Sequence, residues 1–367
     1  MLFILDTLAH GGSEKSAVVL AKLMNEYSSY KLSIIVIDGG KTNPRVVDNL
    51  YQIPPDIDVE YIYETNFTPI KKLLLTPLTL YRIKRMIKGK NINKIMSFHD
   101  YSNLLNVLLK KTFKHKAITS ERRYSKDYFG KRNCYMKYFL RYVFNKADLV
   151  IPNDIEIKES LRNDYKINSK IEVLNNLFSP IGFDKHGPLD KDNQVITFIT
   201  VGRLSDEKNT QDTLYAFSKI KNKNVKLMIV GNGPNEKKLK DLSLSLKIND
   251  KVQFVGAVKN IYNYLDVADI FVFSSLNEGF PNVILEAMYA ELPIISYDFK
   301  AGINSILNGG EYGILIEKNN INNLSDAMLE LAENEELRNK YSKLSKERIQ
   351  KYSDSEKYIN EFLRIIN

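Results

Sequence analysis

Short apolar runs alternate with amphipathic stretches along most of the chain. The runs are rich in Ile, Val, Leu and Phe, as is typical of parallel strands that are buried on both faces. The stretches between them repeat apolar residues at the period of a helix, and Ser13 is the expected N-cap of the first one, at 13–27. A repeated alternation of strand and helix predicts an α/β fold with parallel sheets.

Before residue 179 the pattern predicts a first set of elements. Strands are expected at 2–5, 32–37, 59–61, 94–98, 117–119, 149–151 and 171–174. Helices are expected at 13–27, 70–88, 101–110 and 155–161, with a further basic and aromatic helix ahead of the strand at 149–151.

A turn-rich stretch at 179–194 interrupts the pattern, which then starts again. Strands are expected at 195–201, 225–230, 252–255, 270–273, 293–296 and 313–316. Helices are expected at 210–220, 236–246, 261–266 and 281–290, and the tail at 322–366 is mostly helical.

These elements predict two doubly wound, Rossmann-like parallel-sheet domains that face a central cleft. The first domain spans 1–178, a linker spans 179–194, and the second domain spans 195–350. A C-terminal helix at 351–367 could cross back to the first domain. Ligands of such sheets bind beyond the carboxyl ends of the strands, so the expected site lies in the cleft.

Length and composition narrow the class of protein. A chain of 367 residues fits two domains better than one. The single cysteine excludes an internal disulfide, and four histidines without an HExxH pattern argue against a metal site. We expect no signal peptide, because the chain runs from Met1 directly into a strand, and no apolar run approaches the ~18–20 residues that span a bilayer. A cytoplasmic location is the expectation.

The formal net charge is +9, and the positive charge is concentrated. Between Lys110 and Lys146 there are 12 bases, interleaved with aromatic residues, and only two acids, Glu121 and Asp127. This mixture favours contact with an anionic membrane surface. A solvated basic helix whose aromatic residues pack on the core is the main alternative. Nucleic acid is not expected as a partner, since no recognition motif is present.

Four strand-end loops carry candidate binding residues. Gly11 and Gly12 precede a helix and would allow a ligand to approach the backbone closely. Arg203 and Lys208 follow the strand at 195–201 and suit phosphate oxygens. Gly231 belongs to a third, glycine-rich strand end.

The fourth loop joins two carboxylates. Glu278 follows the strand at 270–273, and Glu286 lies inside the next helix. Pro281 suits the first helical position, because its missing N–H would be unbonded there. The free N–H groups of that helix start favour an anion. The two carboxylates therefore flank a plausible site for a sugar phosphate.

The second half of the chain contains three motifs, Gly202-Arg203-Leu204…Lys208-Asn209, Val230-Gly231-Asn232-Gly233-Pro234 and Glu278-Gly279-Phe280-Pro281-Asn282-Val283…Glu286-Ala287. These motifs resemble those of glycosyltransferase family 4, the retaining GT-B enzymes. Gly11-Gly12-Ser13-Glu14-Lys15, Met96-Ser97-Phe98-His99-Asp100 and Thr119-Ser120-Glu121-Arg122 resemble its bacterial polysaccharide and lipid-linked-oligosaccharide branch.

The resemblance implies roles for these residues. Glu286 would hold the ribose of a nucleotide, and Glu278 the donor sugar. Arg203 and Lys208 would bind the diphosphate. The backbone would assist at positions that share a strand end or helix start: Gly11, Gly12, Gly231, Phe280, Pro281, Asn282 and Val283. The implied donor is a UDP-sugar, and no further cofactor is expected. The implied acceptor is a glycan or a polyprenyl-diphosphate-linked glycan at the inner face of the membrane.

One position departs from the family pattern. Many relatives have a histidine after the strand that is expected to end at Thr119, whereas this chain has Glu121 or Arg122 there. His99 follows the preceding strand and is a candidate for hydrogen bonding to substrate, with a direct catalytic part left open. Glu121 is a further catalytic candidate.

The resemblance implies transfer of a hexose or N-acetylhexosamine with retention of anomeric configuration. Arg203, Lys208 and helix amides would stabilise the departing phosphate without a metal. Asp56-Ile57-Asp58 mimics a metal-binding DxD but is expected to form a turn beside Pro54 and Pro55. Two other functions remain open at this point: a glycoside hydrolase or phosphorylase that uses Glu278 and Glu286 as acid and base, and a basic scaffold that binds membranes or nucleic acid without catalysis.

Overall fold

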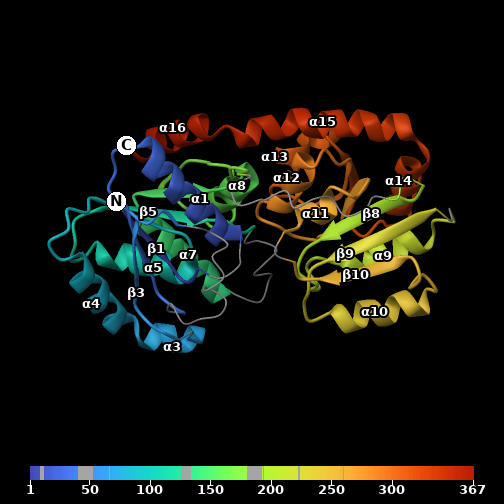
Figure 1. Cartoon of the computed structure of the whole chain (residues 1–367). Coiled ribbons are helices and arrows are strands. Elements are labelled where there is room, and N and C mark those ends of the chain that lie inside the picture. The colour runs from blue at the N-terminus through green and yellow to red at the C-terminus, as the bar shows by residue number, and fades with distance from the viewer. Residues whose placement is uncertain are drawn as a thin grey trace. The chain divides into compact units, whose positions relative to one another are not determined.

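The computed structural model describes residues 1–8, 12–39, 53–65, 67–124, 134–179, 192, 194–221, 224–258 and 260–367. The chain divides into two compact units (Figure 1). Unit 1 comprises Met1–Gly182 together with Asp354–Asn367, and unit 2 comprises Phe183–Ser353. The boundary between them falls within the predicted linker, most of which lies outside the described residues.

Unit 1 is built on a seven-stranded sheet in the order β3-β2-β1-β4-β5-β6-β7. Every pairing between these strands is parallel. The order runs outward in both directions from β1, as in a doubly wound nucleotide-binding fold. The strands are β1 (Leu2–Leu5), β2 (Ser33–Val36), β3 (Asp58–Tyr61), β4 (Lys94–Ser97), β5 (Lys116–Glu121), β6 (Leu149–Pro152) and β7 (Lys170–Ile171).

Helices cover both faces of this sheet. Along β1, Phe3 and Leu5 pack on one face, while Leu2 and Ile4 pack on the other, because side chains alternate across a strand. The first face carries α1 (Gly12–Tyr27) and α16 (Ser355–Ile366), which contact each other. The second face carries α4 (Thr76–Ile87) and α5 (Asp100–Leu109), and α5 contacts α7 (Cys134–Lys146). The remaining helices of unit 1 are α3 (Pro69–Leu74) and α8 (Ile155–Asn163).

Unit 2 repeats the architecture with a six-stranded parallel sheet in the order β10-β9-β8-β11-β12-β13. Its strands are β8 (Ile196–Val201), β9 (Val225–Val230), β10 (Val252–Gly256), β11 (Ile270–Phe273), β12 (Ile294–Asp298) and β13 (Ile314–Glu317). Its helices are α9 (Thr210–Ser218), α10 (Glu236–Ser245), α11 (Tyr262–Leu265), α12 (Asn282–Tyr289), α13 (Ile303–Leu307), the 3-10 turn η1 (Asn308–Gly310), α14 (Ile321–Glu333) and α15 (Glu335–Ser353).

The last helix of the chain, α16, belongs to unit 1, although it directly follows α15 of unit 2. Ile359 and Phe362 are fully buried in the core that also contains α1 and β1. The chain end is held at the same sheet, since Nζ of Lys116 donates to the carbonyl of Ile366 at 2.8 Å. The C-terminal helix is therefore a structural part of unit 1.

Three local predictions were wrong, and one helix was missed. Ser13 is the second residue of α1 and not its N-cap, because the helix already begins at Gly12. The helix expected at 70–88 is two helices, α3 and α4, because Leu75 interrupts it and Pro77, in the first turn of α4, has no N–H to donate to the preceding turn. Pro281 is the N-cap of α12 and not its first helical residue, with φ −79° and ψ 89°. The sequence pattern also missed α13, whose start requires Gly302 at φ 82°.

Candidate functional site

Two sequence-predicted residues of unit 2 meet directly. Nζ of Lys208, in the loop after β8, forms an ion pair with Oε1 of Glu278, in the loop after β11. The hydroxyl of Ser275 donates to the same oxygen at 2.8 Å. Nζ of Lys208 also lies 5.5 Å from the ring centroid of Phe273. The pair is half-buried, so its charges are less screened than those of a surface ion pair.

The two loops are joined by backbone and hydroxyl hydrogen bonds, because β8 and β11 are neighbours in the sheet. The N–H of Leu276 donates to the carbonyl of Glu207 at 2.9 Å. The hydroxyl of Ser274 donates to the carbonyl of Asn209 at 2.9 Å. These bonds fix the spacing between Lys208 and Glu278.

Asn209 completes this support, and the sequence did not single it out as a supporting residue. It has φ 49°, in the left-handed region, and its side chain donates to Oδ2 of Asp212 at 2.7 Å. The hydroxyl of Tyr297, on β12, donates to the same oxygen at 2.8 Å. Burial, followed by the contact with Asp212, raises the pKa of Tyr297. The only available signal was that Asn tolerates left-handed backbone.

Gly231 and Gly233 allow two loops to touch backbone to backbone. A Cβ on Gly231, which has φ 132°, would lie 2.0 Å from the carbonyl oxygen of Gly202. A Cβ on Gly233 would lie 2.3 Å from the carbonyl oxygen of Leu204. The N–H of Leu204 in turn donates to the carbonyl of Asn232 at 2.9 Å. The structure therefore gives Gly231 a packing role beside the candidate site.

Arg203 lies between these contacts with an exposed side chain. Within the described residues, its guanidinium has no carboxylate partner. It is therefore available for an anion, and the ammonium of Lys208 has further N–H donors beyond the one that faces Glu278.

The helix α12 starts beside Glu278. Pro281 provides no side-chain cap, so the helix start relies on other groups for its first N–H donors. Phe280 is buried and packs on the ring of Tyr352 with centroids 5.9 Å apart. A Cβ on Gly302 would lie 2.7 Å from Cδ of Pro281, so the loop before α13 also supports this segment.

The other predicted residues of this segment are placed on the same helix. Asn282 and Val283 are half-buried in its first turn, and Glu286 is 9% exposed one turn further on. Unit 2 therefore gathers Arg203, Lys208, Glu278 and the start of α12 at the carboxyl edge of its sheet.

In unit 1, His99 lies at the corresponding edge, after β4. The N–H of Asp6 donates to its Nδ1 at 3.3 Å, and its Nε2 lies 3.4 Å from Oε1 of Glu14 on α1. Burial acts most strongly and lowers the pKa of His99, but the contact with Glu14 and the charge of Asp6 outweigh it, so the pKa is raised. Neither carboxylate was predicted as a partner of His99.

Glu121 ends β5 and is 2% exposed. Its Oε1 accepts the N–H of Arg122 at 3.0 Å and that of Arg123 at 2.9 Å. Its Oε2 is buried without a hydrogen-bond partner among the described residues. Burial raises the pKa of Glu121, and the charge of Asp100 adds to this, while Arg123 opposes it. A protonated Oε2 could donate a hydrogen bond.

Arg122, the other residue near the departure from the family pattern, has a structural setting. It is buried, its Nε donates to the hydroxyl of Ser120 at 3.1 Å, and its guanidinium carbon lies 5.4 Å from the centroid of Phe98. A guanidinium with these contacts supports the carboxyl edge of the sheet.

The remaining predictions for unit 1 have mixed outcomes. Gly12 is the first residue of α1 and is exposed, whereas Gly11 lies outside the described residues. In the basic aromatic segment, residues 125–133 also lie outside them. The described part is α7, where Val143 and Phe144 are buried while three tyrosines are exposed, namely Tyr135, Tyr138 and Tyr142.

Asp56 and Asp58, which mimic a metal motif, have other partners. Asn25 donates to Asp56 at 2.8 Å, and Lys90 pairs with Asp58 at 3.1 Å. Among the described residues, no group of three or more His, Cys, Asp or Glu side chains could hold a metal ion. In the same part of the chain, no helix has the length and hydropathy of a membrane span.

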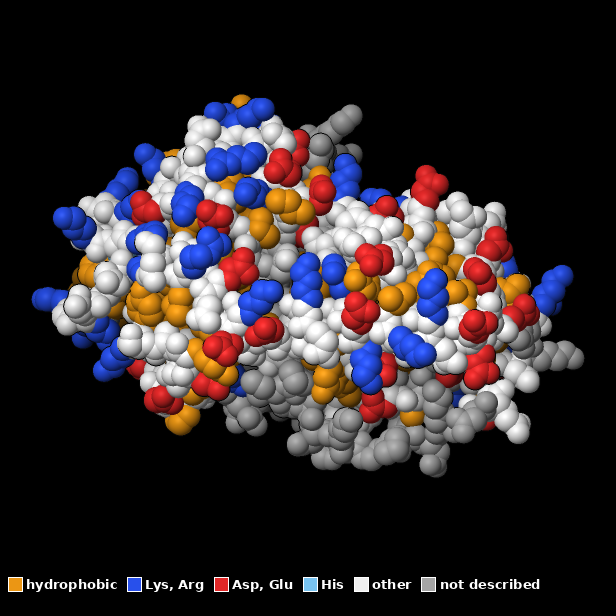
Figure 2. Space-filling model, turned by 90° about the horizontal axis from the view of Figure 1, so that it is seen from above, with side chains coloured by type: hydrophobic (Ala, Val, Ile, Leu, Met, Phe, Trp, Pro, Cys, Tyr) orange, Lys and Arg blue, Asp and Glu red, His pale blue; other side chains and the backbone are white. Residues whose placement is uncertain are grey.

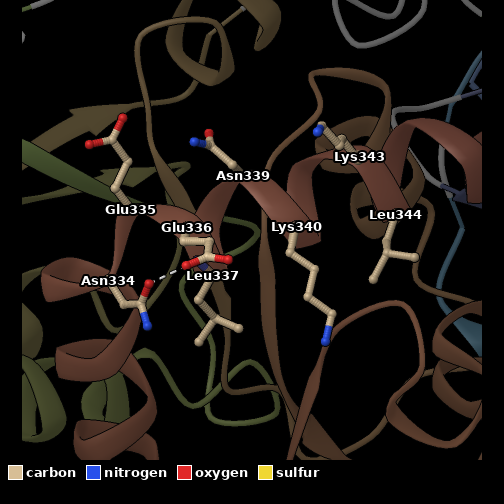
Figure 3. A pocket seen from close by; sticks show the side chains of 8 residues that line it. All are labelled: Asn334, Glu335, Glu336, Leu337, Asn339, Lys340, Lys343 and Leu344. Atoms are coloured by element: carbon tan, nitrogen blue, oxygen red, sulfur yellow. Dashed lines mark hydrogen bonds between the residues drawn. The ribbon is translucent and has the colours of Figure 1, made fainter.

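A surface hollow of about 900 Å³ lies elsewhere in unit 2, at the start of α15 (Figure 3). It is lined by eight residues between Asn334 and Leu344, and the N–H of Leu337 donates to the side chain of Asn334 there at 2.9 Å. That bond is an ordinary helix start. The hollow shares no residue with the strand-end loops, so we place the candidate site at Lys208 and Glu278.

Comparison with known proteins shows the family of the chain. Residues 183–348 match the family described as "Glycosyl transferases group 1". The chain is 30% identical to an uncharacterized glycosyltransferase of Methanocaldococcus jannaschii, over 85% of this chain and 89% of that protein. The chain belongs to the group 1 glycosyl transferases. Membership in this family does not favour the two alternatives, a glycoside hydrolase or phosphorylase and a non-catalytic scaffold.

Two further comparisons extend over both units. The chain is 24% identical to an N-acetylgalactosaminyltransferase of Campylobacter jejuni that acts on a diphospho-undecaprenol-linked sugar, over 93% of this chain and 92% of that protein. The Anabaena protein HepE, solved in complex with UDP, superposes with a TM-score of 0.80 at 15% identity, over 100% of this chain and 98% of that one. The fold is GT-B.

Proposed function

We propose that this chain is a retaining glycosyltransferase of family 4. It moves a hexose or N-acetylhexosamine from a UDP-sugar to a membrane-associated glycan or a lipid-linked acceptor in surface polysaccharide biosynthesis. The observation that carries the proposal is the Lys208–Glu278 pair at the carboxyl edge of unit 2, next to the start of α12. The UDP bound to HepE and the acceptor of the Campylobacter enzyme support the substrate classes.

The donor site divides into a sugar end and a nucleotide end. Glu278 accepts hydroxyls of the sugar; its described contacts, with Lys208 and Ser275, both fall on Oε1, so Oε2 faces this task. Lys208 and the exposed Arg203 bind the diphosphate. Glu286, further along α12, binds the ribose hydroxyls. The first N–H groups of α12 add to the diphosphate site.

The chemistry places charge on the leaving group. The bond between the anomeric carbon and the β-phosphate oxygen breaks, and negative charge develops on the phosphate. Lys208, Arg203 and the helix dipole of α12 stabilise that charge in the transition state. The acceptor oxygen attacks the same face of the sugar, and its proton passes to the departing phosphate. No protein base and no metal ion are needed for this proton balance.

Unit 1 supplies the acceptor side in this proposal. His99, whose Nδ1 accepts from the N–H of Asp6 and whose Nε2 faces Glu14, lies at the carboxyl edge of unit 1, and Glu121 is a buried carboxyl beside it in the sheet. The tyrosines of α7, interleaved with Lys137 and Arg141, bring this unit to the inner face of an anionic membrane, where a lipid-linked acceptor resides.

A panel of UDP-sugars tests the proposal. UDP release is measured with and without a polyprenyl-diphosphate-linked glycan, in buffer and in EDTA. We expect one UDP-sugar to give acceptor-dependent UDP release that persists in EDTA, with the product linkage in the same anomeric configuration as the donor. Release of free sugar from a glycan without any nucleotide would instead identify a hydrolase.

A further inference from the structure

Helix α3 exposes its apolar side chains to solvent and does not bury them in the core. Ile70, Leu73 and Leu74 are 75%, 63% and 77% exposed, and none of its residues is buried. Residues at i, i+3 and i+4 share one face of a helix, so these three side chains form a continuous apolar face toward solvent. An exposed face of this kind marks an interaction surface.

The opposite side of α3 is held to the sheet by a charge. Nζ of Lys72 lies 2.7 Å from Oδ2 of Asp38 and 3.6 Å from Oδ2 of Asp6, at the carboxyl ends of β2 and β1. Two positions separate Lys72 from Ile70 and from Leu74, so its side chain points away from the apolar face. The ion pairs thus hold α3 at this edge with its leucines outward.

The apolar face continues into α4. Leu78 and Tyr81 are 42% and 63% exposed, while Thr79, Ile83 and Ile87 on the other side of the helix are buried. Residues 65–99 contain eight bases and no acid, and the bases are Lys71, Lys72, Arg82, Lys84, Arg85, Lys88, Lys90 and Lys94. The charged residues of this stretch are therefore all basic. Two of them are paired with acids outside it, Lys72 with Asp6 and Asp38 and Lys90 with Asp58 and Glu60.

The whole of unit 1 carries the positive charge of the protein. It has 31 Lys and Arg against 21 Asp and Glu, a formal net charge of +10. Unit 2 has 22 against 23, a net charge of −1. Figure 2 shows one face of the molecule, seen from the side on which α15 and α16 are drawn in Figure 1, and there Lys and Arg side chains lie among apolar and acidic ones.

We propose that the outer face of α3 and the start of α4 insert into an anionic lipid bilayer. The insertion surface consists of Ile70, Leu73, Leu74, Leu78 and Tyr81. A second copy of this chain would bring the same basic surface against this one, and such like charges repel. Aliphatic side chains bordered by Lys and Arg match acyl chains below anionic headgroups.

Insertion here would orient the enzyme as well as attach it. Lys72 places α3 at the carboxyl ends of β1 and β2, the edge that also holds His99. Helix α7 runs toward β6, so in a parallel α/β unit its first turn lies near the same edge. Its tyrosines become more exposed in that direction, from 44% at Tyr142 to 83% at Tyr135. The edge that would receive an acceptor is thereby turned toward the lipid.

This inference rests on exposed side chains alone and does not depend on sugar transfer. The chain contains no tryptophan, so Leu74→Trp provides a single reporter. Leu244→Trp is the matched control, because Leu244 is 59% exposed on α10 of unit 2. With vesicles containing phosphatidylglycerol, we expect a blue shift of emission and quenching by brominated acyl chains for Leu74→Trp only. An unshifted Leu74→Trp emission on vesicle-bound protein, or equal shifts at both sites, would overturn the proposal.

A charge substitution provides the second test. The double variant Leu73→Glu/Leu74→Glu is expected to reduce co-sedimentation with anionic vesicles by at least about 10-fold, since it removes two apolar side chains from the interface. Leu244→Glu is expected to bind like the wild type. UDP release with a detergent-solubilised acceptor should be unchanged in both variants, which separates this proposal from the proposed function. Unchanged vesicle binding of the double variant, or a shift of Leu74→Trp emission with an oligonucleotide in place of vesicles, would contradict lipid insertion.

Discussion

The ammonium of Lys208 contacts Oε1 of Glu278 across 70 residues of sequence, at the ends of two adjacent strands. The cation expected to bind phosphate and the carboxylate expected to bind sugar are thus neighbours before any substrate arrives. The geometry favours a donor site whose two ends are held together by one ion pair.

Glu278 should matter for sugar transfer more than for nucleotide binding. Glu278→Ala removes a charged acceptor for sugar hydroxyls, and such a hydrogen bond contributes ~1.5–3 kcal/mol. We expect kcat/KM for transfer to fall about 10- to 100-fold, while the Kd for UDP stays within about threefold. Glu236→Ala is the control, since Glu236 pairs with Lys240 on the surface of α10. An equal loss in both variants would remove Glu278 from the site.

Gly231 should be sensitive to the smallest substitution. Gly231→Ala places a Cβ 2.0 Å from a backbone oxygen at φ 132°, so the two glycine-rich loops must separate. Gly256→Ala is a matched control, because Gly256 also has positive φ, 82°, but a Cβ there would have no atom within 4 Å. We expect the free energy of unfolding to fall by ~1–3 kcal/mol more for Gly231→Ala than for Gly256→Ala. Equal values in chemical denaturation would show that the loops do not depend on this approach.

His99 and His115 should titrate on opposite sides of the usual histidine range. Burial lowers the pKa of His115, whereas Glu14 and Asp6 raise that of His99 against the effect of burial. With four histidines in the chain, the C2 protons can be assigned by NMR using His99→Asn and His115→Asn. Glu14→Gln should lower the pKa of His99 and leave that of His115 unchanged.

The pKa direction of His99 also fixes the sign of a stability effect. A folded-state pKa above the unfolded value means that protonated His99 stabilises the fold. This contribution is fully present below the unfolded pKa of about 6.5 and is lost as pH rises through the folded pKa. The difference in unfolding free energy between wild type and His99→Asn should therefore shrink with rising pH. A difference that grows with pH would contradict the assignment.

The helix α16 should be required for unit 1 to fold. Phe362 lies on α16 and is fully buried in the core of unit 1. Replacing a core Phe by Ala lowers the free energy of unfolding by ~3–5 kcal/mol. Glu361→Ala, one residue earlier on the exposed side, should change the unfolding free energy by less than ~0.5 kcal/mol. A small effect of Phe362→Ala on the unfolding free energy would mean that unit 1 folds without α16.

Much of this fold could be predicted from the sequence, for a physical reason. Strands such as 270–273 are buried on both faces, so they appear as unbroken apolar runs, and the helices between them keep a regular period. The break at Leu75 was missed because Pro77 is tolerated in the first turn of a helix and did not separate two helices from one.

The candidate site was predicted less completely. Lys208 and Glu278 were found from residue type and position after a strand. Asn209, Asp212 and Tyr297 were not found as their support, because their hydrogen bonds join segments up to 85 residues apart. The apolar face of α3 was missed for a similar reason: Ile70, Leu73 and Leu74 have the spacing of a buried face, and only the structure shows them outward.

The central claim is that the loops after β8 and β11 bind a nucleotide diphosphate through Lys208. Equilibrium binding of UDP, measured by titration calorimetry, tests it most directly. The account predicts that the wild type binds UDP, that Lys208→Ala weakens the affinity by at least about 10-fold, and that Lys240→Ala, which breaks a surface ion pair in the same unit, leaves it unchanged. Equal UDP affinity of wild type and Lys208→Ala would contradict it.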